Sequence, residues 1–120
     1  MENKLSQTTI RVYISGPYSN GDCGENVRVA MTVGDILMRA GFVPFIPHLA
    51  HFWHISFPHT YDEWLDWDLA WLSTCDCMLR LPGQSPGADK EVAMARALRI
   101  PVYYSVEEVI DKAHPKHLIW

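Results

Sequence analysis

Short apolar runs alternate with longer amphipathic segments along the whole chain, and this alternation constrains the fold more than any other feature. The short runs read as strands, and they cover residues 10–14, 42–46, 76–81 and 100–104. Apolar residues at helical spacing predict helices over residues 25–40, 61–73, 87–98 and 106–113. A regular β-α alternation predicts an α/β fold, because right-handed crossovers build a parallel sheet with helices on both faces.

The chain has 120 residues, which is the length of one domain, and nothing in its composition divides it. We expect a single domain over residues 1–120 with flanking tails at 1–9 and 114–120. A net charge of −4 without any run of Lys or Arg argues against binding to a nucleic-acid polymer. Three cysteines do not make a disulfide framework, and we see neither a signal sequence nor a membrane-spanning run. The sequence therefore predicts a cytoplasmic protein with no membrane partner.

The candidate binding edge follows from the predicted topology. Ligands of parallel sheets bind beyond the carboxyl ends of the strands, where the loops here are 15–24, 47–60, 81–87 and 104–106. The second of these loops is long, irregular in pattern and rich in aromatic residues and histidines, so we expect a lid. Its histidines lack the Cys or Glu that would complete a familiar zinc site, and we predict neither a metal nor a cofactor. His48, directly after the second strand, is the histidine that we expect to contact a ligand.

Asp68 and Glu91 occupy positions that helical spacing assigns to the buried faces of their helices. An acid at such a position costs free energy unless it is paired or used. Glu91 lies near the start of its helix, where the macrodipole favours the ionised form. An ionised carboxylate in a partly dry pocket can attack the anomeric carbon of a glycoside. Asp68 would then either orient Glu91 or protonate the departing base.

Arg80 stands at the carboxyl end of the third strand and has two interpretations. It could face the ligand crevice and bind a phosphate, or it could form a salt bridge with Asp68 or Glu91. The other residues of unusual type in this region are interpreted as core: Cys75, Cys77, Trp64, Trp67 and Trp71.

Three short motifs follow one another in a fixed order. They are Ile14-Ser15-Gly16-Pro17-Tyr18, then Asp68-Leu69 with Trp71-Leu72, then Ser85-Pro86-Gly87-Ala88-Asp89-Lys90-Glu91. Together they resemble the nucleoside 2-deoxyribosyltransferase superfamily, which includes the 2'-deoxynucleoside 5'-phosphate N-hydrolases. The similarity extends over nearly the whole chain, from about Val12 to Val102.

The resemblance implies a flavodoxin-like three-layer sandwich with a parallel sheet of four to five strands. It also implies a glutamate nucleophile at Glu91, a supporting aspartate at Asp68 and a substrate-cradling loop. The substrate-binding residues expected on this basis are Ser15, Gly16, Pro17, Tyr18, His48, Arg80, Ser85 and Gly87. A serine at position 85, where the plain nucleoside transferases carry an acid, favours a 5'-phosphorylated substrate. The first loop departs from the hydrolases, because Tyr18 and Ser19 stand where those enzymes carry a basic residue.

The expected function is hydrolysis, or base transfer, at the N-glycosidic bond of a (deoxy)nucleoside 5'-monophosphate. An alternative is a non-catalytic protein that binds or senses a nucleotide or an ADP-ribose-type signal. A third interpretation is a structural α/β module whose buried acids pair with Arg80 and Arg96. Surplus aromatic residues on the helix 61–73, together with Trp120, predict a homodimer or larger homo-oligomer with this helix near the interface.

Overall fold

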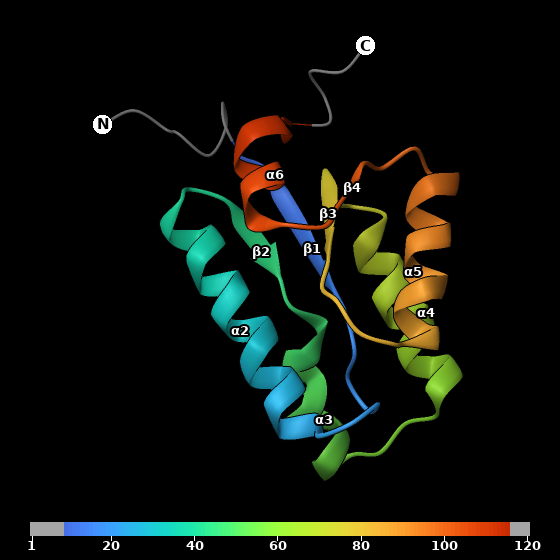
Figure 1. Cartoon of the computed structure of the whole chain (residues 1–120). Helices are drawn as coiled ribbons and strands as arrows, with labels where there is room; N and C mark the ends of the chain where they lie inside the picture. Colours follow the sequence, from blue (N-terminus) through green and yellow to red (C-terminus); the bar gives the residue numbers. More distant parts are fainter. Residues whose placement is uncertain (1–8, 116–120) are drawn as a thin grey trace.

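The computed structural model describes residues 9–115 and shows a parallel sheet with helices packed on both of its faces (Figure 1). The strands are β1 (Arg11–Ser15), β2 (Val43–Phe45), β3 (Cys77–Arg80) and β4 (Val102–Tyr103). The helices are α2 (Cys23–Arg39), the 3-10 helix η1 (Pro47–Ala50), α3 (His51–Ser56), α4 (Tyr61–Leu72), α5 (Pro86–Ala97) and α6 (Val106–Lys112). The C-terminal Trp120 lies outside the described residues.

The sheet order is β2-β1-β3-β4, and all three pairings are parallel. The chain first moves outward from β1 to β2 and then returns to place β3 on the other side of β1. This reversal creates a switch point between β1 and β3, and ligands of open α/β sheets bind at such points. The flavodoxin-like sandwich expected from the sequence is confirmed, with four strands in its sheet.

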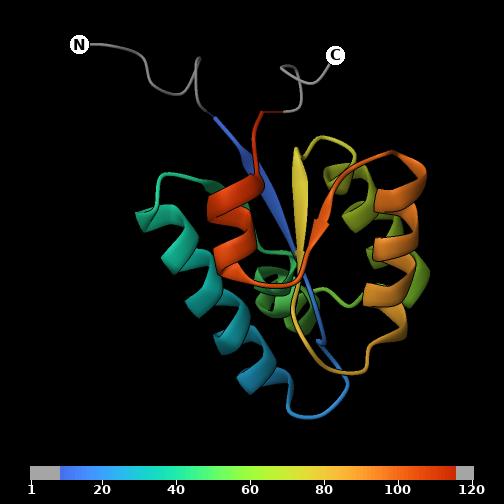
Figure 2. The same ribbon diagram turned by 45° about the horizontal axis from the view of Figure 1, so that its top comes forward.

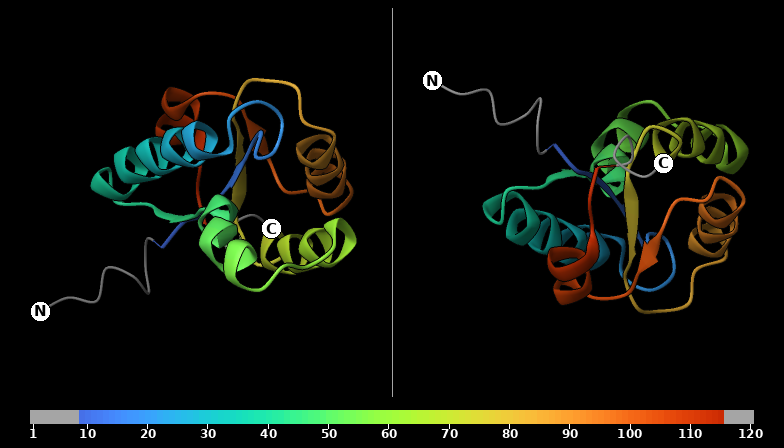
Figure 3. Two further views of the ribbon diagram at one scale, coloured as in Figure 1. Left: turned by 90° about the horizontal axis from the view of Figure 1, so that it is seen from below. Right: turned by 90° about the horizontal axis from the view of Figure 1, so that it is seen from above.

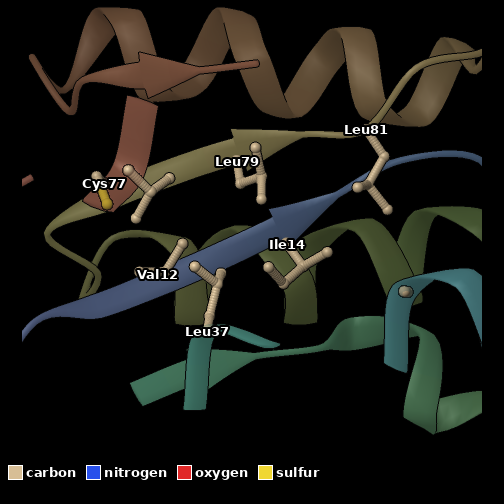
Figure 4. Close-up of a cluster of buried hydrophobic side chains, with 8 residues drawn as sticks. Val12, Ile14, Leu37, Cys77, Leu79 and Leu81 are labelled. Carbon is tan, nitrogen blue, oxygen red and sulfur yellow. The ribbon is translucent and has the colours of Figure 1, made fainter. Parts of the chain in front are cut away.

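Two hydrophobic clusters lie on opposite faces of the sheet. On one face, α2 and α6 pack against side chains of β1 and β3 that include Val12, Ile14 and Leu79 (Figure 4). On the other face, α4 and α5 cover Tyr13 and Met78. Figures 2 and 3 show the resulting layers, with α2 and α6 on one side and α4 and α5 on the other. The sheet thus presents alternate residues of β1 to different helices.

Both cysteines predicted to lie in the core are buried, at 3% exposed for Cys75 and 1% for Cys77. They belong to different clusters, however, and not to one side of a strand as the spacing suggested. The reason is that β3 begins at Cys77, so Cys75 precedes the strand and packs beneath α4.

Helix α2 differs from the sequence prediction in its start and in its buried face. It begins at Cys23, because the side chain of Asp22 accepts a hydrogen bond from the backbone N–H of Glu25 and caps the first turn. Its buried residues are Val27, Ala30, Gly34 and Leu37. The apolar spacing predicts a face of Val29, Val33, Ile36, Leu37 and Ala40. Of these, Leu37 is buried and Val33 packs against the core, whereas Val29 and Ile36 are exposed. Small residues allow the close approach, since a Cβ on Gly34 would lie 2.4 Å from Cδ1 of Ile46.

The composition of the segment 47–60 suggested an irregular loop, but the structure shows that much of it is helical. It contains η1 and α3, and α4 then begins at a capping box in which Thr60 and Glu63 satisfy each other's backbone N–H groups. Strand β4 is shorter than the expected run 100–104, with two residues in the sheet. Within residues 9–115, no helix combines the length and the apolar character that a membrane span requires.

The tryptophans of α4 are not the core residues that their spacing predicted. Trp64 and Trp67 are partly buried, and Trp71 is 47% exposed. Their rings pack beside the edge strand β2, where Phe45 lies 5.6 Å from both Trp67 and Trp71, measured between ring centroids. The aromatic side of α4 therefore extends past the edge of the sheet and does not lie over its centre.

Candidate active site

A cavity of about 600 Å³ opens at the carboxyl ends of the strands, next to the switch point. Its walls come from the β1–α2 loop, from η1 and α3, from α4, and from the start of α5, which meet at the lower end of Figure 1. Seven residues singled out in the sequence line it: Gly16, Tyr18, His48, Asp68, Ser85, Gly87 and Glu91. The fold therefore brings both unusual acids and most of the expected binding residues to one place.

The Glu91 carboxylate is held by two side chains of β1. The Tyr13 hydroxyl donates to Oε2 at 2.9 Å, and the Ser15 hydroxyl donates to Oε1 at 2.8 Å. Both donors are fully buried, and Glu91 itself is 6% exposed. Because Tyr13 and Ser15 are two residues apart on a strand, both point toward the α5 face of the sheet. Sequence reasoning missed Tyr13, although its spacing from Ser15 was the available signal.

Two opposing effects act on the Glu91 carboxyl. Burial, the largest effect, raises its pKa above the ordinary value. Hydrogen bonds with Ser15, Asp68 and Tyr13, together with the positive charge of Arg80, oppose this rise because they stabilise the ionised form. Glu91 is the sixth residue of α5 and lies in its second turn. The macrodipole weakens beyond the first turn, so these hydrogen bonds carry more of the stabilisation.

At Asp68, in contrast to Glu91, all the effects on the pKa of the carboxyl act in one direction. Burial raises the pKa of its carboxyl to about 8, and the nearby charge of Glu91 and a hydrogen bond with it act in the same direction. At neutral pH the Asp68 carboxyl is therefore mostly protonated while Glu91 carries the charge. Two acids this close titrate as a pair that shares one proton. The site thus holds a proton donor and a carboxylate side by side.

His48 is a neutral residue at the base of the cavity. Its Nε2 lies 3.0 Å from the carbonyl oxygen of Pro17, and since a carbonyl only accepts, Nε2 carries the proton. Burial lowers the pKa of the imidazole. The second ring nitrogen, Nδ1, is buried and has no hydrogen-bond partner among the residues that the structure describes. Pro17 is not a lining residue; its carbonyl instead fixes the orientation of His48.

Aromatic and histidine side chains form the outer wall. The Tyr18 hydroxyl lies 2.6 Å from Nδ1 of His51, and the indole N–H of Trp64 donates to Nδ1 of His54 at 2.8 Å. Between residues 9 and 115 there is no group of three or more His, Cys, Asp or Glu side chains arranged to hold a metal ion. His51 and His54 thus form hydrogen bonds with aromatic side chains and contribute to the wall of the cavity.

Lys90 is the only lysine or arginine among the described residues that line the cavity. Its ammonium group lies 4.9 Å from the centroid of the Tyr61 ring, a cation–π distance. Neither residue was expected to bind a ligand, because both side chains are of types that are common at exposed positions, and both are exposed here. Lys90 gives the mouth of the cavity a positive charge close to Glu91.

Ser85 caps α5, since its hydroxyl oxygen accepts a hydrogen bond from the N–H of Ala88 at 3.1 Å. Its hydroxyl proton remains available for a ligand. Arg80 is placed differently from both interpretations, because it neither lines the cavity nor pairs directly with the buried acids. Its guanidinium instead bonds within the β3–α5 connection and to Asp89. Arg96 donates to the Tyr104 hydroxyl at 2.9 Å, so the structural-module interpretation lacks its expected ion pairs.

Comparisons with known proteins agree with this fold. A family model described as "Domain of unknown function (DUF7768)" matches residues 10–105. A search among curated proteins found no sequence match. Among solved structures, a 2-deoxyribosyltransferase from the psychrotolerant bacterium Bacillus psychrosaccharolyticus is similar, with a TM-score of 0.53 and 22% sequence identity. The match covers 77% of this chain and 69% of that enzyme, and at this identity it shows the shared fold.

Replacing Ser15 by Ala should destabilise the protein more at neutral than at acidic pH. The pKa of Glu91 is raised by folding, so the native state binds more protons than the unfolded state and stability falls as pH rises. Loss of the Ser15 donor raises this pKa further. We expect a loss of about 1.5–3 kcal/mol in the free energy of unfolding at about pH 7, and roughly half of that at about pH 4.

Urea unfolding at the two pH values measures this difference. Ser73→Ala is the matched control, because the Ser73 side chain is exposed and donates to the Ala70 carbonyl and not to a carboxylate of the site. The control should lose the same small amount at both pH values. Equal losses for Ser15→Ala at the two values would contradict the assigned hydrogen bond to an ionised Glu91.

Proposed function

This chain belongs to the DUF7768 family, and we propose that it cleaves the N-glycosidic bond of a nucleoside 5'-monophosphate, by hydrolysis or by base transfer. The observation that carries the proposal is a pair of acids that line the cavity, Glu91 buried and Asp68 partly buried. Glu91 is oriented through both of its oxygens by Tyr13 and Ser15. Asp68 beside it has a pKa raised to about 8. An ionised carboxylate next to a protonated one is the pair that retaining glycosidic cleavage uses.

In the proposed reaction, a carboxylate oxygen of Glu91 attacks the anomeric carbon while the bond from that carbon to the base nitrogen breaks. The departing base takes the proton of Asp68, and the sugar remains attached to Glu91 as an ester. Water, or a second base, then attacks the same carbon and releases Glu91. The proton lost by this second nucleophile returns to Asp68, so the enzyme ends in its starting state.

The phosphate end of the substrate is assigned to the start of α5. The Ser85 hydroxyl has a free proton, the N–H of Gly87 belongs to the first turn, and Lys90 supplies a positive charge nearby. Helix N-termini favour anions because their first backbone N–H groups lack helical partners. Lys90 would take the role of cation that the sequence suggested for Arg80. The base would then lie toward the wall of α3 and α4.

Glu91→Gln should reduce turnover by about two orders of magnitude or more, the scale of losing a positioned catalytic group. The amide keeps the shape of the side chain, so binding of the nucleotide should largely survive. The measurement is release of free base from a panel of ribo- and deoxyribonucleoside 5'-monophosphates, followed by chromatography. Tight nucleotide binding without base release from the wild-type protein would favour the alternative of a nucleotide sensor, and near wild-type turnover by the variant would exclude Glu91 as nucleophile.

Ser85→Ala should weaken the binding of a nucleoside 5'-monophosphate by about 1.5–3 kcal/mol, the range for a hydrogen bond to a charged group. Binding of the matching nucleoside should change little. Ser105→Ala is the control, because Ser105 caps α6 in the same way but lies away from the cavity. Calorimetric titration with each ligand gives the difference. Equal weakening for nucleotide and nucleoside would show that Ser85 acts only as a helix cap.

We also propose that the protein is a homodimer or larger homo-oligomer that associates beside the edge strand β2. Exposed apolar side chains gather on the elements around this edge, on α2, η1, α3 and α4: Met31, Met38, Leu49, Phe52, Trp53, Ile55 and Trp71. Between them lies a groove of about 470 Å³. Pro44 removes a donor from the middle of β2, which argues for side-chain packing and against strand pairing at this edge.

Light scattering at micromolar concentration should give at least twice the mass of one chain, and Trp71→Glu should shift the protein toward single chains by placing a charge in the interface. Ile110→Glu is the matched control, since Ile110 is 50% exposed on α6 and does not line the groove beside β2. A single-chain mass for the wild-type protein, with base release intact, would contradict this assembly.

A further inference from the structure

Arg80 is a buried cation that does not reach the candidate active site. It is the last residue of β3 and is 9% exposed. Its guanidinium donates to the carbonyl oxygen of Leu81, to that of Gly83 at 3.0 Å, and to Oδ1 of Asp89 at 3.1 Å. It borders a separate hollow of about 570 Å³, whose lining shares no residue with the cavity that holds Glu91. Arg80 is therefore not one of the residues that line the cavity beside Glu91.

The hydrogen bonds of Arg80 connect three successive parts of the chain. Leu81 and Gly83 form the turn after β3, where Gly83 has a φ of +113°, a conformation that side chains rarely adopt. Asp89 is in the first turn of α5. Between the turn and the helix stands Ser85, the cap residue assigned to the phosphate. A planar guanidinium with several donors can hold such a turn in a way that a single ammonium group cannot.

The positive charge of Arg80 also acts on the carboxyl of Glu91, the proposed nucleophile. Tyr13 and Ser15 of β1, Asp68 of α4 and Arg80 of β3 all act on the Glu91 carboxyl. On α5 itself, Lys90 precedes Glu91 and lines the cavity mouth. The strand register explains the approach, because Ser15 pairs with Arg80 across the β1–β3 ladder and both side chains face α5. The positive charge beneath α5 therefore favours the ionised form of Glu91.

We propose that Arg80 is a positioning residue of the active site, whose guanidinium fixes the turn that presents Ser85 and whose charge favours an ionised Glu91. Its catalytic consequence rests on the proposed function. Its effect on the turn does not, because it follows from the hydrogen bonds alone. The two roles separate by substitution, since Lys keeps the charge but loses the planar set of donors, whereas Gln loses the charge.

The test compares Arg80→Lys and Arg80→Gln with Arg96→Gln. Arg96 is a matched control because it borders the same hollow, and its hydrogen bond goes to the Tyr104 hydroxyl and not to the turn. Hydrogen–deuterium exchange of the amides in residues 81–88 reports on the turn in the whole protein without any need for activity. Steady-state base release from a nucleoside 5'-monophosphate gives kcat and KM over a range of pH. Thermal unfolding checks that each variant is folded.

We expect faster exchange at residues 81–88 in both Arg80 variants, by about tenfold or more, and a several-fold rise in KM for the nucleotide. Only Arg80→Gln should move the acid limb of the kcat/KM profile, upward by about one pH unit, because Glu91 then ionises less readily. Arg96→Gln should match the wild type in all three readouts. If Arg80→Gln does not fold, Arg80→Lys still decides the positioning role through its exchange and KM.

Wild-type exchange and KM in Arg80→Lys would overturn the proposal, and so would a folded Arg80→Gln variant with a wild-type pH profile. Lower activity with an unchanged KM, pH profile and exchange would also overturn it, because that result means only a smaller folded fraction. If the wild-type protein releases no base, the proposed function fails, and exchange at residues 81–88 still tests the hold of Arg80 on the turn.

Discussion

The arrangement of the sheet and its helices depends on the burial of one carboxylate. Glu91 carries its charge beneath α5, where an unpaired carboxylate would cost several kcal/mol. Tyr13 and Ser15 offset that cost with one hydrogen bond to each oxygen. These bonds form only if β1 lies beside β3 in the observed register and α5 crosses above both strands. The hydrogen bonds that hold the Glu91 carboxylate therefore also link β1 to α5.

The shape of the turn between β3 and α5 depends on a few residues. Gly83 takes a backbone conformation that favours glycine, and Ser85 ends the turn by capping the helix. The guanidinium of Arg80 donates hydrogen bonds to the carbonyl oxygens of Leu81 and Gly83 and so stabilises the turn. Gly16 allows the neighbouring β1–α2 loop to approach, since a Cβ there would lie 2.8 Å from Cβ of Leu81. Close packing of these two loops thus helps to fix where the turn before α5 lies relative to the end of β1.

The sequence was informative where one residue broke a pattern. Asp68 and Glu91 could be found because an acid stands out on the apolar stripe of a helix. Tyr13 was missed because β1 is buried on both faces and a tyrosine there looks like any core residue, so that its spacing of two from Ser15 was the only signal. The direction of the Arg80 side chain could not be predicted from the sequence either, since a side chain at the end of a strand can turn to either side of the helix that packs on it. The predicted burial of the α4 tryptophans was wrong for a similar reason, because helical spacing identifies a common face but not whether a sheet lies beneath all of it.

The proton of the acid pair belongs to Asp68 because the two carboxyls have unequal surroundings, not because of their residue types. Glu91 receives hydrogen bonds from Tyr13 and Ser15 and feels the charge of Arg80, all of which favour its anion. For Asp68, burial and the neighbouring charge both favour the neutral acid. Each acid therefore stabilises the state of the other, since the charge on Glu91 raises the pKa of Asp68 and the proton on Asp68 can bond to Glu91. One strand, one arginine and one neighbouring helix thus set the unequal surroundings of the two carboxyls.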